Sequence, residues 1–592
     1  MTGVATGAKP TDEAGRSFVP GLGAFRTYRR GWLGKDVSAG LVLTALLVPQ
    51  GMAYAELAGL PAVTGLYTSV LCLLGYAVFG PSRVLVLGPD SSLGPMIAAT
   101  VLPLVAADGD PARAIALASM LGLMVGVLLV LAGVGHLGLI ADLLSKPTQI
   151  GYMNGLALTI VIGQMPKLFG FSIDASGLVE ELKGFVQGVQ DGKTVGAALG
   201  IGLFSLVLIV VFQRWLPKVP AVLVAVVVAI IGATLLDLGD KGVTLVGVLP
   251  QGFPALTIPR ITGSDLAPLL IGALGIALVS LTDTISTASV FAGRAGQEVR
   301  ANQEMIGIGA ANLAAGLFQG FPVSTSSSRT AVAESAGAKS QLTGVVGAGA
   351  ITAMLLFLPG LLQNLPQPTL AAVVIAAALS LADIAATRKL WRQRRSEWLV
   401  SVVAFLGVAI LGVLPGIAVA VLLSVFNVFR RSWWSYRTRL GRVPDVAGFH
   451  DVTLRPGAEE LEGLILFRFD GPLFFANVRS FTEDIRALAR TEPPPRWIVL
   501  AAEPMTDVDP TAAEILTKLY DELTERGIQV AIAELKDPVR AKLEHYEASG
   551  VVDDSRIFGT IEEAVAAYLA AHPDSEWQPT TVKRSSTERD SR

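Results

Sequence analysis

The chain is poor in the residues that build disulfides, metal sites and charged surfaces. Cysteine occurs once, at Cys72, which excludes an intramolecular disulfide and a cysteine-based zinc site. The four histidines lie far apart in the sequence, so no His-rich metal motif is present and we expect no cofactor. Charged residues make up only 16% of the 592 residues, whereas about a quarter is usual in soluble proteins. The chain is therefore not one soluble globule.

The charge balance also excludes one class of partner. Lys and Arg number 46 and Asp and Glu number 49, which gives a formal net charge of −3. Nucleic-acid binding usually needs a basic face, so no nucleic-acid partner is expected. No phosphate-binding loop, zinc-protease motif or nucleophile elbow is present, so no catalytic residue is assigned and the chain is not expected to be an enzyme.

Long apolar runs fill the region from about residue 34 to residue 428. A helix needs roughly 20 apolar residues to cross a bilayer, and this region has room for about 14 such helices, some of them short. We predict an all-α polytopic membrane domain over 31–432, with two halves of seven spans each. The predicted spans are 36–57, 63–80, 90–106, 113–134, 138–166, 194–215, 219–238, 265–292, 303–318, 325–337, 343–358, 368–384, 397–413 and 415–430.

Basic residues support this order of spans. Lys and Arg gather in short cytoplasmic loops, and each cluster here follows an even-numbered span or precedes the first one, as at 388–395 and 430–442. The polar tail 1–30 lacks the pattern of a signal peptide. We therefore expect both termini to be cytoplasmic and the membrane to be the inner cell membrane.

The composition changes after the last span. Charged residues become common, and strand-like runs alternate with amphipathic helices over 463–573. This alternation predicts a small cytoplasmic α/β domain. We interpret 433–462 as a linker and 574–592 as a disordered tail.

Two segments interrupt the apolar pattern at corresponding positions of the two halves. They are 84–99, which contains Gly88-Pro89, and 320–337, which contains Phe321-Pro322. In each, a short extended run precedes a helix start marked by serines. Paired interruptions of this kind are typical of transporters with inverted repeats and broken helices.

The broken helices suggest an anion site near the middle of the bilayer. The free N–H groups and positive end of a half-helix favour a negative ligand, and Arg329 adds a full charge. The hydroxyls of Ser91, Ser92, Ser326 and Ser328 can donate further hydrogen bonds. The alternative for any one serine is an ordinary helix cap.

Three stretches closely resemble the SulP family of anion transporters: 47–70, 79–92 and 302–341. The region 463–570 resembles the STAS domain that follows the membrane part in that family. The resemblance implies a uracil-permease-like core (spans 1–4 and 8–11) that moves past a gate (spans 5–7 and 12–14) like an elevator, and a homodimer. It also implies that the site is lined by Gln50, Tyr54, Ser91, Ser92, Thr325, Ser326, Ser327, Ser328 and Arg329.

Acidic residues inside the membrane suggest coupling to a cation. Asp283 lies in the middle of the eighth span, with Thr287 four residues later on the same helix face. The resemblance implies Na⁺ at these two residues in some relatives. A proton carrier and a static pair with Arg329 are the other interpretations. Glu56 and Asp90 are further candidates for coupling, Asp90 being a departure from the apolar residue that is commoner in vertebrate relatives.

One candidate for regulation lies in the C-terminal domain. Thr511 occupies the position of the phosphorylated serine in related bacterial antagonists, in a weak version of the motif, 509–512. A helix cap is the favoured role, and phosphorylation is the alternative. A cytoplasmic partner that binds this domain would fit the phosphorylation of Thr511.

The favoured function is secondary active transport of a small inorganic or carboxylate anion with H⁺ or Na⁺. The sequence does not select among sulfate, bicarbonate and dicarboxylates. An uncoupled exchanger or channel is the second interpretation, and a membrane anchor that presents the STAS domain for signalling is the third.

Overall fold

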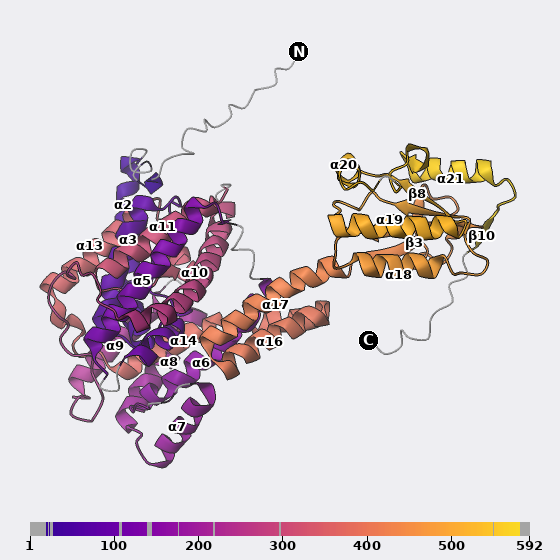
Figure 1. Ribbon diagram of the computed structural model, residues 1–592. Helices are drawn as coiled ribbons and strands as arrows, with labels where there is room; N and C mark the ends of the chain where they lie inside the picture. Colours follow the sequence, from indigo (N-terminus) through magenta and orange to yellow (C-terminus); the bar gives the residue numbers. More distant parts are fainter. Residues whose placement is uncertain are drawn as a thin grey trace. The chain divides into compact units, whose positions relative to one another are not determined.

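The computed structural model describes residues 19–21, 23, 28–105, 109–138, 145–173, 175, 177–216, 219–294, 298–548 and 550–579. The chain divides into two compact units, one up to Val425 and one from Phe426. The first, here the membrane unit, is helical (Figure 1). Its main elements are α2 (Leu33–Leu57), α3 (Ala62–Phe79), β1 (Leu87–Gly88), α4 (Gly94–Val101), α5 (Pro111–Val134), α6 (Lys146–Leu168), α7 (Leu178–Gln190), α8 (Gly196–Trp215), α9 (Ala221–Leu235), α10 (Leu266–Arg294), α11 (Ala301–Leu317), β2 (Ser324–Thr325), α12 (Ser327–Ser335), α13 (Leu342–Phe357), α14 (Gln367–Leu381), α15 (Ile384–Gln393), α16 (Arg395–Leu411) and α17 (Val413–Trp433).

The helices follow the predicted order of spans, with differences in length. In the described residues, seven helices are long and apolar enough to cross a membrane by themselves. Others are short because the chain breaks, as at α4 and α12. Helices α7 and α15 lie in stretches that we expected to be loops, because a strongly amphipathic helix has no long apolar run.

Packing sorts the helices into two groups. Helices α2, α3, α5, α10, α11 and α13 pack on one another, and α6, α8, α14 and α16 form a second set. The first set contains helices of the predicted core and the second contains helices of the predicted gate, and α14 also packs on α2. Close contact depends on glycine: a Cβ at Gly65 would lie 1.9 Å from the carbonyl oxygen of Gly51 on the facing helix. The α2–α3 crossing therefore tolerates no side chain at Gly65.

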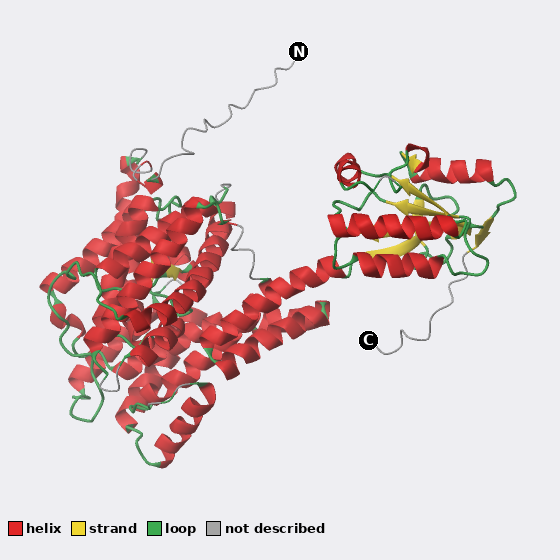
Figure 2. Cartoon of the chain, viewed as in Figure 1, coloured by secondary structure: helices red, strands yellow, loops and turns green. Residues whose placement is uncertain are grey.

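The two interruptions meet inside the core. Strand β1 pairs antiparallel with β2, Leu87 opposite Thr325 and Gly88 opposite Ser324, and Figure 2 shows this strand within the helical unit. The pair also uses side chains, since the N–H of Val86 donates to Thr330 Oγ1 at 3.1 Å. Backbone at this depth must find partners in the protein because lipid offers none. The pairing sets the two half-helix starts side by side.

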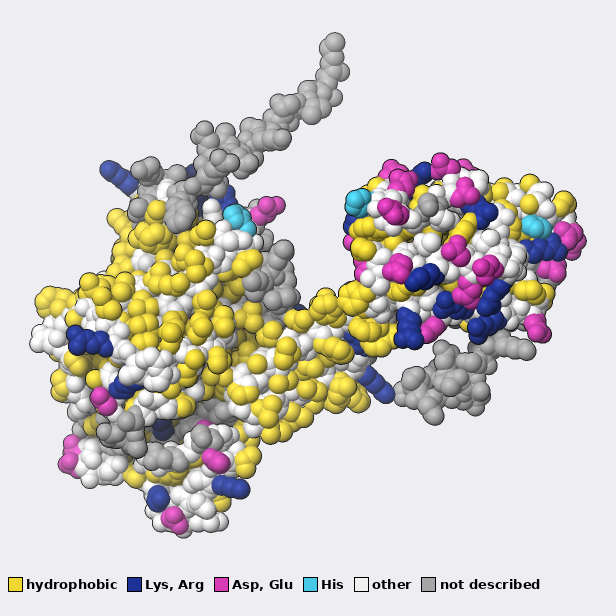
Figure 3. Space-filling view, in the orientation of Figure 1, with side chains coloured by type: hydrophobic (Ala, Val, Ile, Leu, Met, Phe, Trp, Pro, Cys, Tyr) yellow, Lys and Arg dark blue, Asp and Glu magenta, His cyan; other side chains and the backbone are white. Residues whose placement is uncertain are grey.

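The exterior of the membrane unit is apolar. Figure 3 shows hydrophobic side chains covering most of its visible face, with charged side chains sparse. Large apolar residues are exposed along several helices, for example Leu131, Phe204 and Ile271. Such a surface suits contact with lipid chains.

A buried carboxylate joins the start of α2 to the loop between α12 and α13. Asp36 Oδ1 accepts the N–H groups of Lys339 (2.6 Å) and Ser340 (3.2 Å) and the hydroxyl of Thr343 (3.1 Å). Its other oxygen accepts the hydroxyls of Ser340 and Tyr28. Donors from three segments therefore depend on one side chain.

We expect Asp36→Ala to lower the free energy of unfolding by about 3 kcal/mol, because it leaves several buried donors unpaired. Asp110 is the matched control, since it caps α5 by accepting the N–H of Ala112 at an exposed site, and Asp110→Ala should cost about 1 kcal/mol. Thermal unfolding in detergent measures both. Equal effects of the two substitutions would contradict the assigned role of Asp36.

The second unit is a mixed sheet covered by helices. Its strands are β3 (Tyr436–Arg442), β4 (Phe449–Asp451), β5 (Glu459–Leu461), β6 (Leu464–Asp470), β7 (Trp497–Ala501), β8 (Gln529–Ala533), β9 (Ile557–Phe558) and β10 (Trp577–Pro579), and its helices are α18 (Val478–Leu488), α19 (Pro510–Glu525), α20 (Asp537–His545) and α21 (Ile561–Ala571). In the described residues the order is β10-β5-β3-β6-β7-β8-β9, with β4 beside β3.

Alternation along β6 explains the layers of this domain. Phe467 and Phe469 pack on the face that α18, α19 and α20 cover, whereas Leu464 and Leu466 pack on the face covered by α21. Strands β3, β4 and β5 lie within 433–462, the range that we interpreted as a linker, and β10 lies within the expected tail. These strands are polar on one side, for example at Arg439 and Glu460, which form a cross-strand ion pair at 3.2 Å. Apolar patterning alone therefore missed them.

Candidate functional site

The starts of the two half-helices form the centre of the site. Helix α12 begins at Ser327 as expected, and the Ser326 hydroxyl caps it by accepting the N–H of Arg329 at 3.4 Å. Helix α4 begins at Gly94, later than the predicted start at 90–92. The reason is that Asp90 Oδ1 accepts the N–H of Ser92 at 3.0 Å, which holds 90–93 as a turn.

Arg329 is the central charge of this region. Only 1% of its side chain is exposed, and its Nη2 lies 3.5 Å from Asp90 Oδ2. Its Nε and Nη1 have no hydrogen-bond partner in the described residues. A Cβ at Gly88 would lie 2.8 Å from Nη1, so the backbone of β1 packs directly on the guanidinium. A buried guanidinium with two free donors is suited to a negative ligand.

Three side chains link the half-helix α4 to α10. The Ser92 hydroxyl lies 2.8 Å from Asp90 Oδ1 and 3.1 Å from Asp283 Oδ2. The ion pair of Arg329 is formed with Asp90, so the static Asp283–Arg329 pair considered from the sequence is not the one found. Asp283 therefore contacts the site through Ser92.

Helix α10 supports β2, the residue before it and α12 with hydroxyl contacts. Thr287 Oγ1 lies 2.6 Å from Ser327 Oγ, and Thr284 Oγ1 lies 2.9 Å from Thr325 Oγ1. The Ser280 hydroxyl donates to the carbonyl of Val323 at 2.9 Å. Ser326 and Ser328 are joined at 3.1 Å. Thr325, Ser327 and Thr287 thus contribute to positioning the half-helix start.

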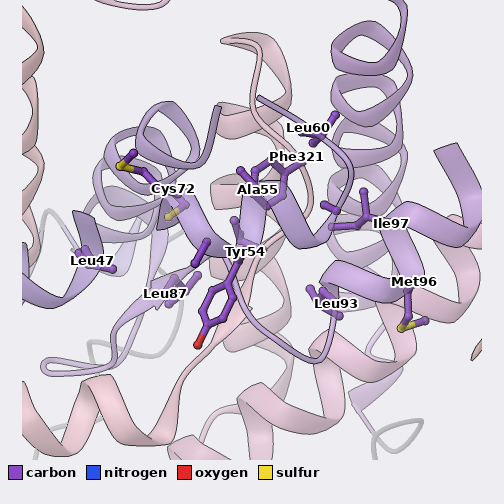
Figure 4. Packing of buried hydrophobic residues seen from close by; sticks show 14 of the residues in the cluster. Leu47, Tyr54, Ala55, Leu60, Cys72, Leu87, Leu93, Met96, Ile97 and Phe321 are labelled. Carbon is purple, nitrogen blue, oxygen red and sulfur yellow. The ribbon is translucent and has the colours of Figure 1, made fainter. Parts of the chain in front are cut away.

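The first span approaches the site through Tyr54. Figure 4 shows the Tyr54 ring projecting from α2 between the segments that carry Leu87 and Leu93. Tyr54 and Ser91 are both buried, each with 5% exposure. Gln50 lies one turn earlier on the same helix face, next to Pro49, which interrupts the helix hydrogen bonds.

Sequence reasoning missed Tyr152 on α6. Its side chain is fully buried, and its hydroxyl has no hydrogen-bond partner in the described part of the chain. Tyr152 lies on α6, a helix of the predicted gate. The signal in the sequence is a tyrosine in an otherwise apolar span, which is too common to be specific.

Asn312 on α11 was also missed. Its amide oxygen accepts the N–H of Val323 at 2.9 Å, and its amide nitrogen donates to the carbonyls of Val323 and Ile308. It holds the extended segment that leads into β2. A buried amide within a glycine-rich helix is the signal that could have indicated this role.

Glu56 lies apart from these residues. It lines a separate cavity of about 430 Å³ between the α2–α3 turn, the end of α6 and 246–250. Lys167 Nζ donates to the backbone oxygen of Glu56 at 3.4 Å. The structure therefore does not bring Glu56 together with Asp283 and Asp90.

Thr511 is an exposed residue in the first turn of α19. The cap of this helix is Asp509, whose Oδ1 accepts the N–H of Ala512 at 2.7 Å. The cap role that we favoured for Thr511 thus belongs to Asp509. Phosphorylation of Thr511 stays a prediction.

The described residues hold no group of three or more His, Cys, Asp or Glu side chains that could bind a metal ion. The donors present are hydroxyls, backbone N–H groups at two helix starts and one arginine. They suit electrostatic binding of a small anion without covalent chemistry.

Comparisons with known proteins identify the family of this chain. The Sulfate permease family profile matches 33–404, and a STAS domain matches 455–564. A probable sulfate transporter of Mycobacterium tuberculosis is 40% identical over 93% of this chain and 98% of its own length. Human solute carrier family 26 member 6 is 32% identical over 77% of this chain and 63% of its own length.

Solved structures show the same fold. The murine Solute Carrier 26 family member A9 anion transporter in its inward-facing state has a TM-score of 0.87 at 25% identity and covers 96% of each chain. The transmembrane domain of the cyanobacterial bicarbonate transporter BicA covers 67% of this chain and 98% of its own, with a TM-score of 0.58. The chain belongs to the sulfate permease family and is a multi-pass membrane anion transporter with a C-terminal STAS domain.

Proposed function

We propose that the chain is a secondary active transporter that carries a small anion of the sulfate, bicarbonate or dicarboxylate class by an elevator movement of the core past the gate. The observation that carries this proposal is the buried Arg329 with two unpaired donors between two half-helix starts. The β1–β2 pair joins both half-helices, so they can move together. The sulfate transporter names of the relatives favour sulfate.

We further propose coupling to H⁺ through Asp283. The Ser92 hydroxyl has one hydrogen but contacts the carboxylates of both Asp90 and Asp283. Asp90 faces Arg329 and is the natural place for the negative charge. A proton on Asp283 would then donate to Ser92 and complete the chain of hydrogen bonds. Na⁺ at Asp283 and Thr287 is the alternative, and the hydroxyl of Thr287 is already joined to Ser327.

The same proposal includes the orientation of the chain in the membrane and its assembly. Both termini would lie in the cytoplasm of a cell with this protein in its inner membrane, where a cytoplasmic partner could bind the STAS domain. Assembly as a homodimer belongs to this proposal.

Reconstituted uptake tests the proposed function. Proteoliposomes would be given labelled sulfate, bicarbonate, chloride and dicarboxylates, each with an imposed pH gradient, an imposed Na⁺ gradient or neither. Concentrative uptake of one anion class that depends on the pH gradient is the expected result. Dependence on Na⁺ alone would replace the proton with Na⁺, and no saturable uptake of any anion would refute the transport proposal.

We expect Tyr152→Phe to raise the KM for the anion by about fivefold with little change in kcat, because one neutral donor to a bound anion contributes about 1 kcal/mol. The matched control is Tyr67→Phe on α3, which removes the hydroxyl of another buried tyrosine. If Tyr152 serves only packing, the KM of Tyr152→Phe will equal that of Tyr67→Phe.

A further inference from the structure

Three of the donors expected to bind the anion, the N–H and hydroxyl of Ser92 and Nη2 of Arg329, already contact a carboxylate of the protein itself. Asp90 Oδ1 accepts the N–H and the hydroxyl of Ser92, in the turn just before α4, at 3.0 and 2.8 Å. Its Oδ2 lies 3.5 Å from Nη2 of Arg329 on α12. One side chain thus contacts the electropositive features of both half-helices.

The burial of the two partners differs. The Arg329 side chain is 1% exposed and the Asp90 side chain 14% exposed. Arg329 is held by β1, since Gly88 packs on Nη1, whereas Asp90 lies in a turn before α4 rather than within a helix. The arginine is therefore fixed, and the carboxylate is the partner that can move aside.

We propose that Asp90 is a resident counter-ion that competes with the transported anion for Arg329 and Ser92, and so sets both the affinity and the charge preference of the site. This inference rests on the proposed function. With Asp90 ionised, its charge cancels that of Arg329, so an entering anion meets little net attraction until the carboxylate gives up its donors. The competition keeps binding weak enough for release.

The charge of the ligand gives this proposal a specific signature. The electrostatic energy between Asp90 and a bound anion scales with the charge of that anion. Removing the charge of Asp90 should therefore increase the affinity for both kinds of anion. The fold-increase for a divalent anion should be about the square of the fold-increase for a monovalent anion. For a tenfold gain with chloride or nitrate, the gain with sulfate would be about a hundredfold.

The experiment uses the full chain with Asp90→Asn and Asp90→Ser, and compares the affinities for sulfate and nitrate measured by thermal shift in detergent and by uptake into proteoliposomes. The expected result is a lower Kd and KM for both anions, with the larger change for sulfate. Asp90→Glu keeps the charge and should stay close to the native affinity. Asp265→Asn is the matched control, because it neutralises the carboxylate of another arginine pair, Arg113–Asp265 at 2.6 Å, outside the site.

Two results would overturn the proposal. One is an unchanged or weaker affinity for sulfate in both neutral variants while the native chain binds and transports it. The other applies if the neutral variants are unstable. Sulfate should then restore their stability, because it replaces the missing carboxylate. Failure of sulfate to do so would contradict the competition. Absence of anion binding and uptake by the native chain would instead refute the proposed function.

Discussion

Replacing Arg329 with glutamine is expected to reduce anion uptake by about a hundredfold, because a hydrogen-bonded charge in a buried site contributes up to about 3 kcal/mol. The half-helix starts would remain, but they supply only partial charges. Arg329→Lys keeps the charge and loses the planar fork, so its activity should lie between those of glutamine and the native residue. Initial rates in proteoliposomes at equal protein content measure the series.

Arg113→Gln provides the control for this series. Arg113 also pairs with a carboxylate, Asp265, and its side chain is more exposed than that of Arg329. Loss of this pair should affect the stability of the fold by a small amount, because a partly exposed ion pair contributes little to it. The uptake rate should stay within about twofold of the native rate. Native rates in Arg329→Gln would show that the anion binds elsewhere.

The second large effect is expected for Asp283→Asn, which should abolish uptake driven by a pH gradient. The native chain should transport faster when the outside is more acidic, because in the proposed coupling Asp283 carries a proton inward with the anion. An asparagine cannot release a proton but can still donate to Ser92, so exchange of labelled for unlabelled anion without a gradient should survive within about fivefold, the loss of about one hydrogen bond. Parallel assays of driven uptake and exchange separate the two steps.

Glu304→Gln tests whether neutralising any buried carboxyl would abolish uptake driven by a pH gradient. Glu304 is 1% exposed and is bonded by the hydroxyls of Tyr76 and Ser82 at the start of α11. No contact joins it to Asp283 or Arg329 in the described residues, so its variant should keep the response to pH. If Asp283→Asn keeps the response as well, the proton travels by another route.

Patterns local in sequence predicted the broken helices but not all of their contacts. Gly88-Pro89 and Phe321-Pro322 mark the interruptions because proline and glycine act on the neighbouring backbone. The pairing of Leu87 with Thr325 joins residues far apart in the chain, and nothing local specifies such a register. The same reason hid the contact of Asp90 with Arg329.

The residues that were missed are ordinary in isolation. Tyr152 and Asn312 each lie in an apolar helix, where a single polar residue often serves packing. Their roles depend on which helix faces them, and this follows from tertiary packing rather than from periodicity. Conversely, the predicted tail after Pro573 contains β10, because a strand that pairs through its backbone needs little apolar character.

The β1–β2 pair also bears on how the protein is made. During synthesis the first seven spans are complete long before 324–325 leave the ribosome. Until then the N–H and C=O groups of Leu87 and Gly88 have no strand to pair with, and an unpaired peptide group in lipid costs several kcal/mol. The first half of the membrane unit is thus synthesised before the strand that pairs with β1 exists. Formation of the β1–β2 pair is therefore a late event that only the second half can complete.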